Sequence, residues 1–225
     1  MKNCEQRGLA ISAHCDDCAW AFSGAVAQLA ARAQVDGVLF TDSDYEKNGP
    51  LRHSEELAAM AVLGMRDLYP VGQDRGFQDG QLCLSHYGQM VMELNRLLDR
   101  AEETGRPYTD LYTFGPDGYS GHPDHAIVAN VAGFVFHHRP NNNLARLWMV
   151  GMSEEERALW DPNYFVFIPP VNIKDYIPVD ITDTRPKKLA AIQAHTSQLH
   201  NGTAEHFARI QTLPPIEYYK VYNRI

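Results

Sequence analysis

The chain has 225 residues and a mass of 25.4 kDa, long enough to bury a sizeable core, so residues 1–225 are expected to form a single domain. Hydrophobic residues make up 44% and charged residues 21%, which argues against a disordered or fibrous chain. A net charge of -8 without a basic stripe disfavours nucleic acid as a partner. No apolar run suits a membrane span or an export signal, so we expect a cytoplasmic protein whose four cysteines are reduced.

Strands and helices are predicted to alternate along the first two-thirds of the chain. In chain order, we expect a strand at 8–13, a helix at 18–33, a strand at 37–41, a helix at 51–64, a strand at 66–71, a helix at 84–103, a strand ending at 112–114, a helix at 123–137 and a strand at 145–151. This alternation predicts a Rossmann-like α/β fold, in which helices cover both faces of a doubly wound, mostly parallel sheet.

The last third of the chain has a less regular pattern. Strands are predicted at 166–168 and 176–181 around a proline-rich bend, followed by a helix at 187–198 and a closing strand at 216–222.

Two short acid/histidine motifs follow the first and fourth predicted strands. They are Ala-His-Cys-Asp-Asp at 13–17 and Gly-His-Pro-Asp-His at 121–125. In a doubly wound sheet of order 3-2-1-4-5, strands 1 and 4 are neighbours at the switch point, where ligands bind beyond the carboxyl ends of the strands. We therefore expect the two motifs to meet in one crevice.

Three residues of these motifs are the predicted metal ligands. His14, Asp17 and His125 would make a two-histidine, one-carboxylate site with an open position, in which zinc lowers the pKa of bound water towards about 7. We expect one Zn²⁺ per chain, with Fe²⁺ or Co²⁺ as alternatives for the same donors. In a purely structural alternative, Asp17 is a helix cap and His125 a core histidine.

The remaining polar residues of the motifs supply proton transfer and charge stabilisation. Asp16 is the predicted general base, because it lies beside a ligand without being needed as one. His122 is predicted to polarise the substrate carbonyl and stabilise the oxyanion, and Asp124 to hold His122 in its cationic form. Alternatively, Asp16 and His122 cap the helices that follow them.

The motifs carry a resemblance to the PIG-L/LmbE-like deacetylases, zinc enzymes that remove the acetyl group from N-acetylglucosaminyl compounds and related amides. Their signature is Ala-His-Pro-Asp-Asp near the start and Gly-His-x-Asp-His in the middle. The further matching patterns are Arg52-x-x-Glu55 with Leu63-Gly64, Asp79-Gly80, and the helix from Lys188 to His195-x-Ser197-Gln198.

The resemblance implies the same metal ligands, base and oxyanion pair, and an N-acetylated amino sugar or related amide as the small-molecule substrate. It further implies that Arg52 and Asp79 contact the sugar. Tyr119 lies near the place of a mobile tyrosine in some members, one residue further from the histidine than expected. The identity of the acyl acceptor stays open, as does the oligomeric state, with a homo-oligomer as one alternative.

The chain departs from the family pattern at Cys15 and Cys18, where the family usually has proline and glutamate. A Cys-x-x-Cys that opens a helix also permits a second hypothesis, a thioredoxin-like redox protein. Because the two intervening aspartates oppose thiolate formation, we expect both cysteines to be packing residues. A third hypothesis, a non-catalytic sugar-binding protein, would require the base or a ligand to be missing.

Overall fold

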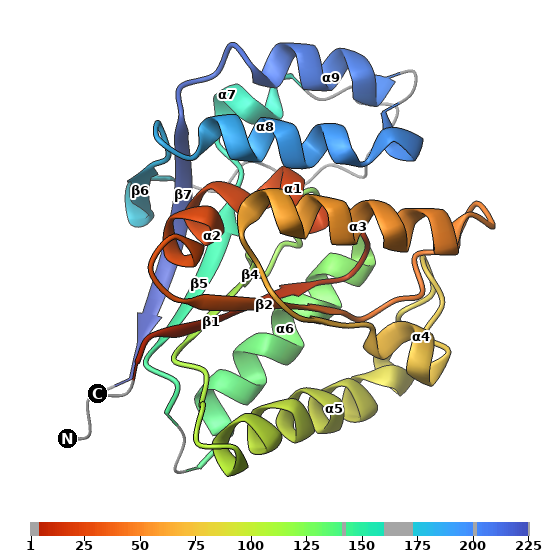
Figure 1. Cartoon of the computed structure of the whole chain (residues 1–225), viewed down its shortest axis with the longest axis vertical. Coiled ribbons are helices and arrows are strands. Elements are labelled where there is room, and N and C mark those ends of the chain that lie inside the picture. The colour runs from red at the N-terminus through yellow and green to blue at the C-terminus, as the bar shows by residue number, and fades with distance from the viewer. Residues whose placement is uncertain (1–4, 141–142, 160–172, 200–201, 225) are drawn as a thin grey trace.

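A seven-stranded sheet of order β3-β2-β1-β4-β5-β7-β6 runs through the centre of the computed structural model, which describes residues 5–140, 143–159, 173–199 and 202–224 (Figure 1). Its strands are β1 (Arg7–Ser12), β2 (Gln34–Leu39), β3 (Leu68–Tyr69), β4 (Asp110–Phe114), β5 (Arg146–Gly151), β6 (Ile177–Asp180) and β7 (Ile216–Asn223). Strands β1 to β5 pair in parallel, whereas β7 pairs antiparallel with both β5 and β6. The predicted doubly wound, mostly parallel sheet is confirmed.

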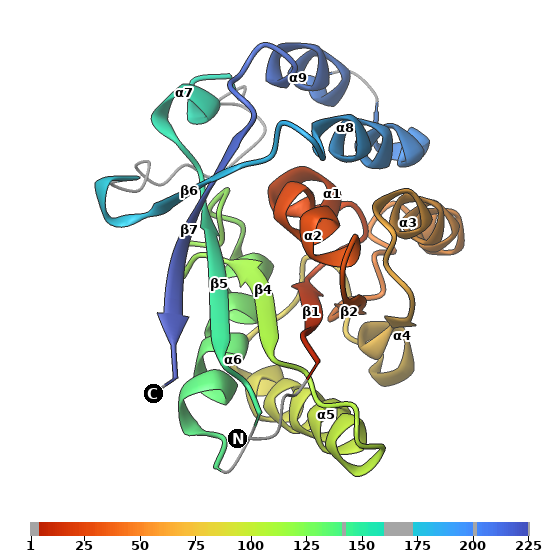
Figure 2. The same cartoon turned by 60° about the vertical axis from the view of Figure 1, so that its left-hand side comes forward.

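Helices cover both faces of this sheet. They are α1 (Asp17–Ala21), α2 (Ser23–Ala30), α3 (Gly49–Leu63), α4 (Val71–Arg75), α5 (Leu84–Glu103), α6 (Pro123–His138), α7 (Glu154–Arg157), α8 (Arg185–Ala194) and α9 (Gly202–Ile210), with 3₁₀ turns η1 (Ile173–Asp175) and η2 (Thr196–Gln198). Helices α5 and α6 lie on one side of the sheet, and α1, α2, α3 and α8 lie on the other (Figure 2). Among the described residues, no helix is both long and apolar enough to cross a membrane.

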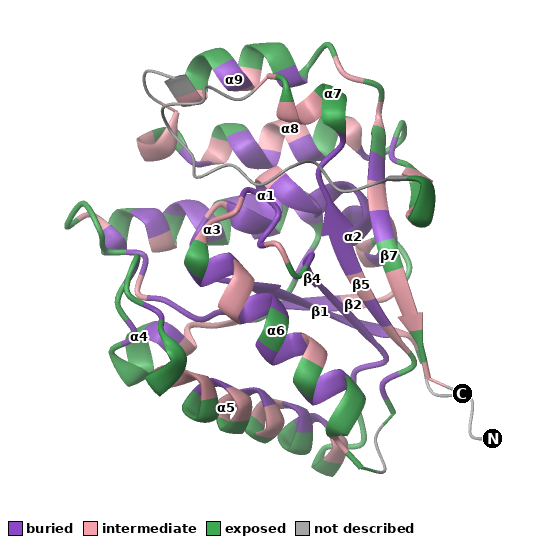
Figure 3. Ribbon diagram, turned by 180° about the vertical axis from the view of Figure 1, so that it is seen from behind, coloured by how far each residue is buried: buried purple, intermediate pink, exposed green. Residues whose placement is uncertain are grey.

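The central strands are buried along their whole length. Every residue of β1 and of β4 is buried, as expected for strands that carry helices on both faces (Figure 3). The two strands pair directly, with Gly8 opposite Asp110 and Ala10 opposite Tyr112. Their carboxyl ends therefore open side by side, which is the arrangement predicted for the two motifs.

Several boundaries differ from the predictions. The single helix predicted at 18–33 is two helices, because Phe22 leaves helical geometry (φ -136°, ψ 15°) and the Ser23 hydroxyl donates to the Ala19 carbonyl across the break. The helix predicted at 187–198 ends at Ala194, and its last turn is the separate η2. Helices α4, α7 and α9 were not predicted; α4 and α7 are short, with five and four residues. The strand predicted at 166–168 lies outside the described residues.

The late-helix motif joins α8 to the rest of the fold through a buried ion pair. Lys188 Nζ lies 2.7 Å from Glu217 Oε1 of β7. The Glu217 carboxylate also accepts the backbone N–H groups of Gly24 and Ala25, at 2.9 and 3.0 Å, in the first turn of α2. A carboxylate is favoured there because the first N–H groups of a helix have no partner within the helix. The Lys188–Glu217 pair thus joins α8, β7 and the start of α2.

His195 follows α8 and is fully buried, which gives the fold a predictable dependence on pH. Burial lowers the pKa of His195 from 6.5 to about 4, against an opposing effect of the Glu55 carboxylate. At pH values between these two pKa values, His195 therefore binds a proton in the unfolded chain but not in the folded chain. The contribution of neutral His195 to the free energy of unfolding is complete above pH 6.5 and is lost as the pH falls towards 4.

Between about pH 8 and about pH 5, the free energy of unfolding should fall by about 2 kcal/mol more in the wild type than in His195→Gln, which lacks the titrating group. Urea unfolding of both proteins at the two pH values measures this difference. An equal decrease in the two proteins would contradict it.

Candidate metal centre and active site

The first motif is a turn that fixes its own carboxylate. After β1 the chain turns at Asp16, whose φ of 86° is left-handed, and α1 begins at Asp17. The Asp17 Oδ2 atom accepts the backbone N–H groups of Ala13, at 3.0 Å, and His14, at 2.7 Å. This back-bonding holds one carboxylate oxygen, so the other can face the second motif. Asp16 makes no side-chain cap on α1, contrary to the capping alternative.

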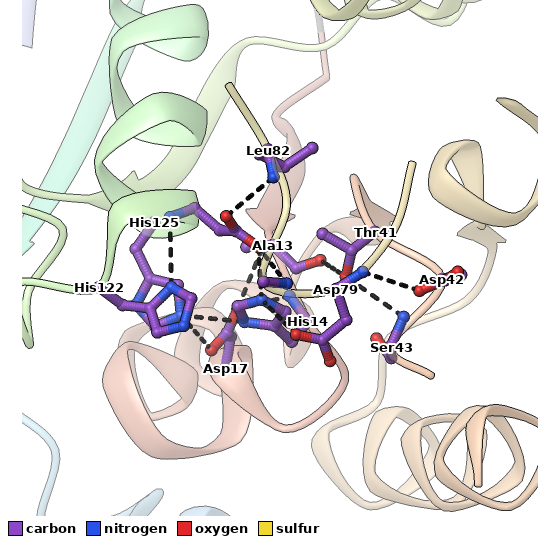
Figure 4. A network of polar contacts seen from close by, with 12 residues as sticks. Ala13, His14, Asp17, Thr41, Asp42, Ser43, Asp79, Leu82, His122 and His125 are labelled. Atoms are coloured by element: carbon purple, nitrogen blue, oxygen red, sulfur yellow. Dashed lines mark hydrogen bonds and ion pairs between the residues drawn. The ribbon is translucent and has the colours of Figure 1, made fainter. Parts of the chain in front are cut away.

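The three predicted ligands converge in the structure. His125 Nε2 lies 3.0 Å from Asp17 Oδ1 and 3.1 Å from His14 Nδ1, and His14 Nδ1 lies 3.5 Å from Asp17 Oδ2. Figure 4 shows these side chains meeting between the turn after β1 and the start of α6. Tetrahedral donors about 2.0–2.1 Å from a zinc ion are roughly 3.3 Å apart, so the spacing fits one metal ion.

Other donors surround the same point. The ligand atoms of His14, His122 and His125 lie within 4.8 Å of one another, which makes His122 a further potential donor. We favour Asp17 over His122 as the third ligand because its carboxylate oxygens directly contact both histidines. Burial alone would raise the pKa of Asp17, but His125 and His14 lower it well below its usual value. The carboxylate is therefore ionised, as a metal ligand must be.

The far nitrogen of His14 is held by two carboxylates. His14 Nε2 lies 3.1 Å from Asp124 Oδ2 and 3.1 Å from Asp79 Oδ1. Asp124 in turn accepts the backbone N–H groups of Gly80, at 2.8 Å, and Leu82, at 3.1 Å. Carboxylates in this position fix the ring orientation of a ligating histidine, so both aspartates can hold His14 with Nδ1 towards the metal.

This geometry corrects the predicted role of Asp124. We expected its carboxylate to hold His122 as a cation, but the carboxylate contacts His14 instead. The His122 Nδ1 atom accepts the backbone N–H of Asp124 at 3.2 Å, which caps α6 and requires that this nitrogen carry no proton. Burial, followed by repulsion from His14 and His125, lowers the pKa of His122 to about 4. His122 is a neutral ring whose proton is on Nε2.

Asp16 is partly buried and lies beside the ligands, next to the guanidinium group of Arg52. Arg52 Nη2 lies 3.6 Å from Asp16 Oδ1 and donates to the carbonyl of Cys15 at 3.0 Å. Burial raises the pKa of Asp16 to about 8, although the Arg52 charge opposes this. A carboxyl group that titrates near neutral pH can both accept and return a proton.

The residues predicted to contact the sugar are bonded to the protein itself. Arg52 Nη1 lies 2.9 Å from Asp79 Oδ2, and both side chains are buried. Tyr119 has a left-handed backbone (φ 63°), a buried ring and a hydroxyl that donates to Glu156. The turn that contains Tyr119 also positions a ligand, since the Gly118 carbonyl lies 3.1 Å from His125 Nδ1.

Sequence reasoning missed two residues of α3 and its preceding loop. Ser43 Oγ accepts the N–H of Cys15 at 2.8 Å, and Glu56 Oε2 accepts the N–H of Asp16 at 3.0 Å. A signal for Glu56 was present, because it lies one helical turn after Arg52 and so faces the same side of α3.

Cys15 and Cys18 are buried free thiols, with exposed fractions of 1% and 3%. Burial, reinforced by the Glu56 charge, raises the pKa of both thiols. The redox hypothesis needs a lowered thiol pKa. The environment of the two cysteines opposes thiolate formation and supports packing.

Comparison with known proteins identifies the family. The sequence pattern of the GlcNAc-PI de-N-acetylases (PIG-L) matches residues 9–135, a range that includes both motifs. The chain belongs to the PIG-L family. It is 27% identical over 155 residues to a probable N-acetyl-α-D-glucosaminyl L-malate deacetylase 2 of Bacillus anthracis, which covers 69% of this chain and 59% of that relative.

Solved structures share the fold at low sequence identity. N,N'-diacetylchitobiose deacetylase from Pyrococcus horikoshii superposes with a TM-score of 0.68 at 19% identity, covering 97% of this chain and 84% of that one. GalB, a 4-carboxy-2-hydroxymuconate hydratase from Pseudomonas putida KT2440, gives a TM-score of 0.63 at 18% identity, with 98% of each chain covered. Since one of these is a hydratase, the fold alone does not determine the reaction.

Proposed function

We propose that this protein is a metal-dependent amide hydrolase that removes an N-acetyl group from an N-acetylglucosamine-containing or related amino sugar. The observation that carries this proposal is the convergence of His14, Asp17 and His125, with the Asp16 carboxyl group beside them. The family match and the deacetylases among the similar proteins support the choice of reaction.

The donor set fits one divalent ion, which we propose to be Zn²⁺, with Fe²⁺ or Co²⁺ able to use the same ligands. When bound, such an ion polarises a carbonyl and makes water a stronger nucleophile at neutral pH. Asp16 accepts the proton of the attacking water and returns it to the nitrogen as the C–N bond breaks, which yields acetate and a free amine.

His122 acts as a neutral donor in this scheme. Its Nδ1 is occupied by the N–H of Asp124, so Nε2–H is left to donate to the oxyanion of the tetrahedral intermediate. Asp79 and Asp124 orient His14 through their contacts with its Nε2 atom. Arg52, Asp79 and Tyr119 stay proposed sugar contacts, and the Arg52–Asp79 pair supports an additional orienting role for both. The continuous sheet supports a single deacetylase domain over residues 1–225, and a cytoplasmic location stays an expectation.

The proposed reaction predicts release of a primary amine. Purified protein loaded with Zn²⁺ would be incubated with N-acetylglucosamine, its malate and inositol glycosides, and N,N'-diacetylchitobiose, and free amine measured with fluorescamine. We expect release from at least one of these, its loss after treatment with a chelator and its return with added Zn²⁺. Binding without amine release would favour a sugar-binding protein, and hydration of 4-carboxy-2-hydroxymuconate would favour a GalB-like reaction.

The matched control for this experiment is the double variant Cys15→Ser/Cys18→Ser. Because both thiols are buried and protonated, the variant should keep most of the amine release and stay sensitive to chelation. Complete loss in the variant, together with insensitivity of the wild type to chelators, would support a thiol mechanism instead.

A further inference from the structure

The buried face of α3 carries charged residues where apolar ones are usual. Arg52, Glu55 and Glu56 are buried, with exposed fractions of 7%, 6% and 4%, whereas Leu51 and Leu57 of the same helix are about half exposed. Charged side chains are rarely buried unless they are paired, because removing them from water is costly. The burial of these three charged side chains therefore indicates that they make specific hydrogen bonds or ion pairs.

Glu55 makes bonds that join two elements of the fold. Its carboxylate accepts from the Thr196 hydroxyl at 2.6 Å, and from the N–H and hydroxyl of Ser197 at 2.8 and 2.6 Å. These contacts attach η2 to α3. These contacts explain the burial of Glu55 and give it a structural role.

Glu56, one position along, lies near both His195, whose Nε2 atom is 3.4 Å from Glu56 Oε2, and the turn after β1. Its Oε2 atom accepts the backbone N–H of Asp16 at 3.0 Å, while Arg52, one turn earlier, donates to the carbonyl of Cys15 at 3.0 Å. The side chains of Arg52 and Glu56 therefore hold the peptide unit that joins Cys15 to Asp16 from both ends. That unit carries the proposed base.

The turn at Asp16 needs support from outside itself. Asp16 has a left-handed backbone (φ 86°), which is strained at a non-glycine residue and persists only when its surroundings hold it. The Asp16 N–H also precedes the hydrogen-bond ladder of α1, so it requires an acceptor elsewhere. Glu56 supplies that acceptor from a rigid helix of 15 residues.

We propose that Glu56 is a positioning residue that holds the Asp16 peptide, and through it the Asp16 carboxyl group, in place for proton transfer. This inference rests on the proposed deacetylase function. Glu56 acts as a hydrogen-bond acceptor in this role, so its amide analogue should serve and an apolar residue should not.

The test compares Glu56→Gln, which keeps an acceptor, with Glu56→Leu, which removes it. Glu56→Leu should lower kcat about 10- to 100-fold, the effect of misplacing a catalytic group, with KM and metal content little changed. Glu56→Gln should keep kcat within about threefold of the wild type, because a neutral acceptor replaces most of the bond. Glu55→Ala is the matched control on the same helix, and it should lower thermal stability with little effect on kcat.

A second measurement does not depend on activity. Amide hydrogen exchange of Asp16, followed by NMR, should be about tenfold faster in Glu56→Leu than in the wild type, and close to wild type in Glu56→Gln. Absence of deacetylation in the wild type would refute the proposed function, while this exchange still tests the positioning contact.

Three results would overturn the inference. They are a wild-type kcat in Glu56→Leu, equal loss of kcat in Glu56→Leu and Glu55→Ala, and unchanged exchange of the Asp16 amide in Glu56→Leu.

Discussion

Replacing Asp16 by Asn is expected to lower kcat roughly 10²- to 10⁴-fold, the contribution of general acid/base catalysis, while one metal ion per chain is retained. The amide has nearly the shape of the carboxyl group but cannot take the proton from water or return it to the leaving nitrogen. Metal should stay bound because the three converging donors are His14, Asp17 and His125. Steady-state amine release and elemental analysis of the same preparation measure the two quantities together.

The outcome for metal content decides between the two adjacent aspartates. If Asp16→Asn loses its metal, Asp16 is a ligand and Asp17 is left as the base. The structure opposes that exchange, since Asp17 contacts both histidines whereas Asp16 faces Arg52. The raised pKa of Asp16, for which burial is the main cause, gives a further check, because Asp16→Asn should remove any dependence of kcat on that group.

The topology and the meeting of the two motifs could be predicted because they follow from local periodicity. Apolar runs and helical repeats place the ends of β1 and β4 side by side in any doubly wound sheet. Residues that directly follow those strands must then share a crevice. For this reason His14, Asp17 and His125 could be paired across about a hundred positions without knowledge of the structure.

What could not be predicted depends on contacts between distant segments. The role of Asp124 depends on the loop after α4, where the N–H groups of Gly80 and Leu82 fix the carboxylate towards His14. Sequence proximity had favoured His122 as its partner, since the two residues are only two positions apart. In α6, however, residue 122 is the cap of the helix and its ring accepts from the backbone instead.

The burial of Glu56 likewise depends on contacts between distant segments. A charged residue in an amphipathic helix is most simply expected on the solvated face. Its burial becomes evident only when α3 packs beside the turn after β1, where the Asp16 N–H needs an acceptor. The break between α1 and α2 at Phe22 also involves a contact between distant segments. The Phe22 ring is fully buried and packs against Phe114.

Replacing His125 by Ala is expected to remove the metal and to lower amine release by at least about 10³-fold, since a bound metal ion contributes several kcal/mol to the transition state. Alanine deletes one of three donors, and it also removes the Nε2 contact of 3.0 Å to Asp17. Two remaining donors bind a divalent ion much more weakly than three. Elemental analysis after dialysis should therefore give close to one ion per wild-type chain and close to none in the variant.

His138→Ala is the matched control, because His138 is an exposed residue at the end of the same helix α6, where its Nδ1 atom lies 3.0 Å from the Phe134 carbonyl oxygen and its ring stacks on that of Phe134. It should keep both the metal and the activity. Circular dichroism would show that His125→Ala is folded, so that loss of metal cannot be attributed to unfolding. Near-equal metal content in the wild type and in a folded His125→Ala protein would remove His125 from the ligand set, and with it the hydrolytic mechanism built on that set.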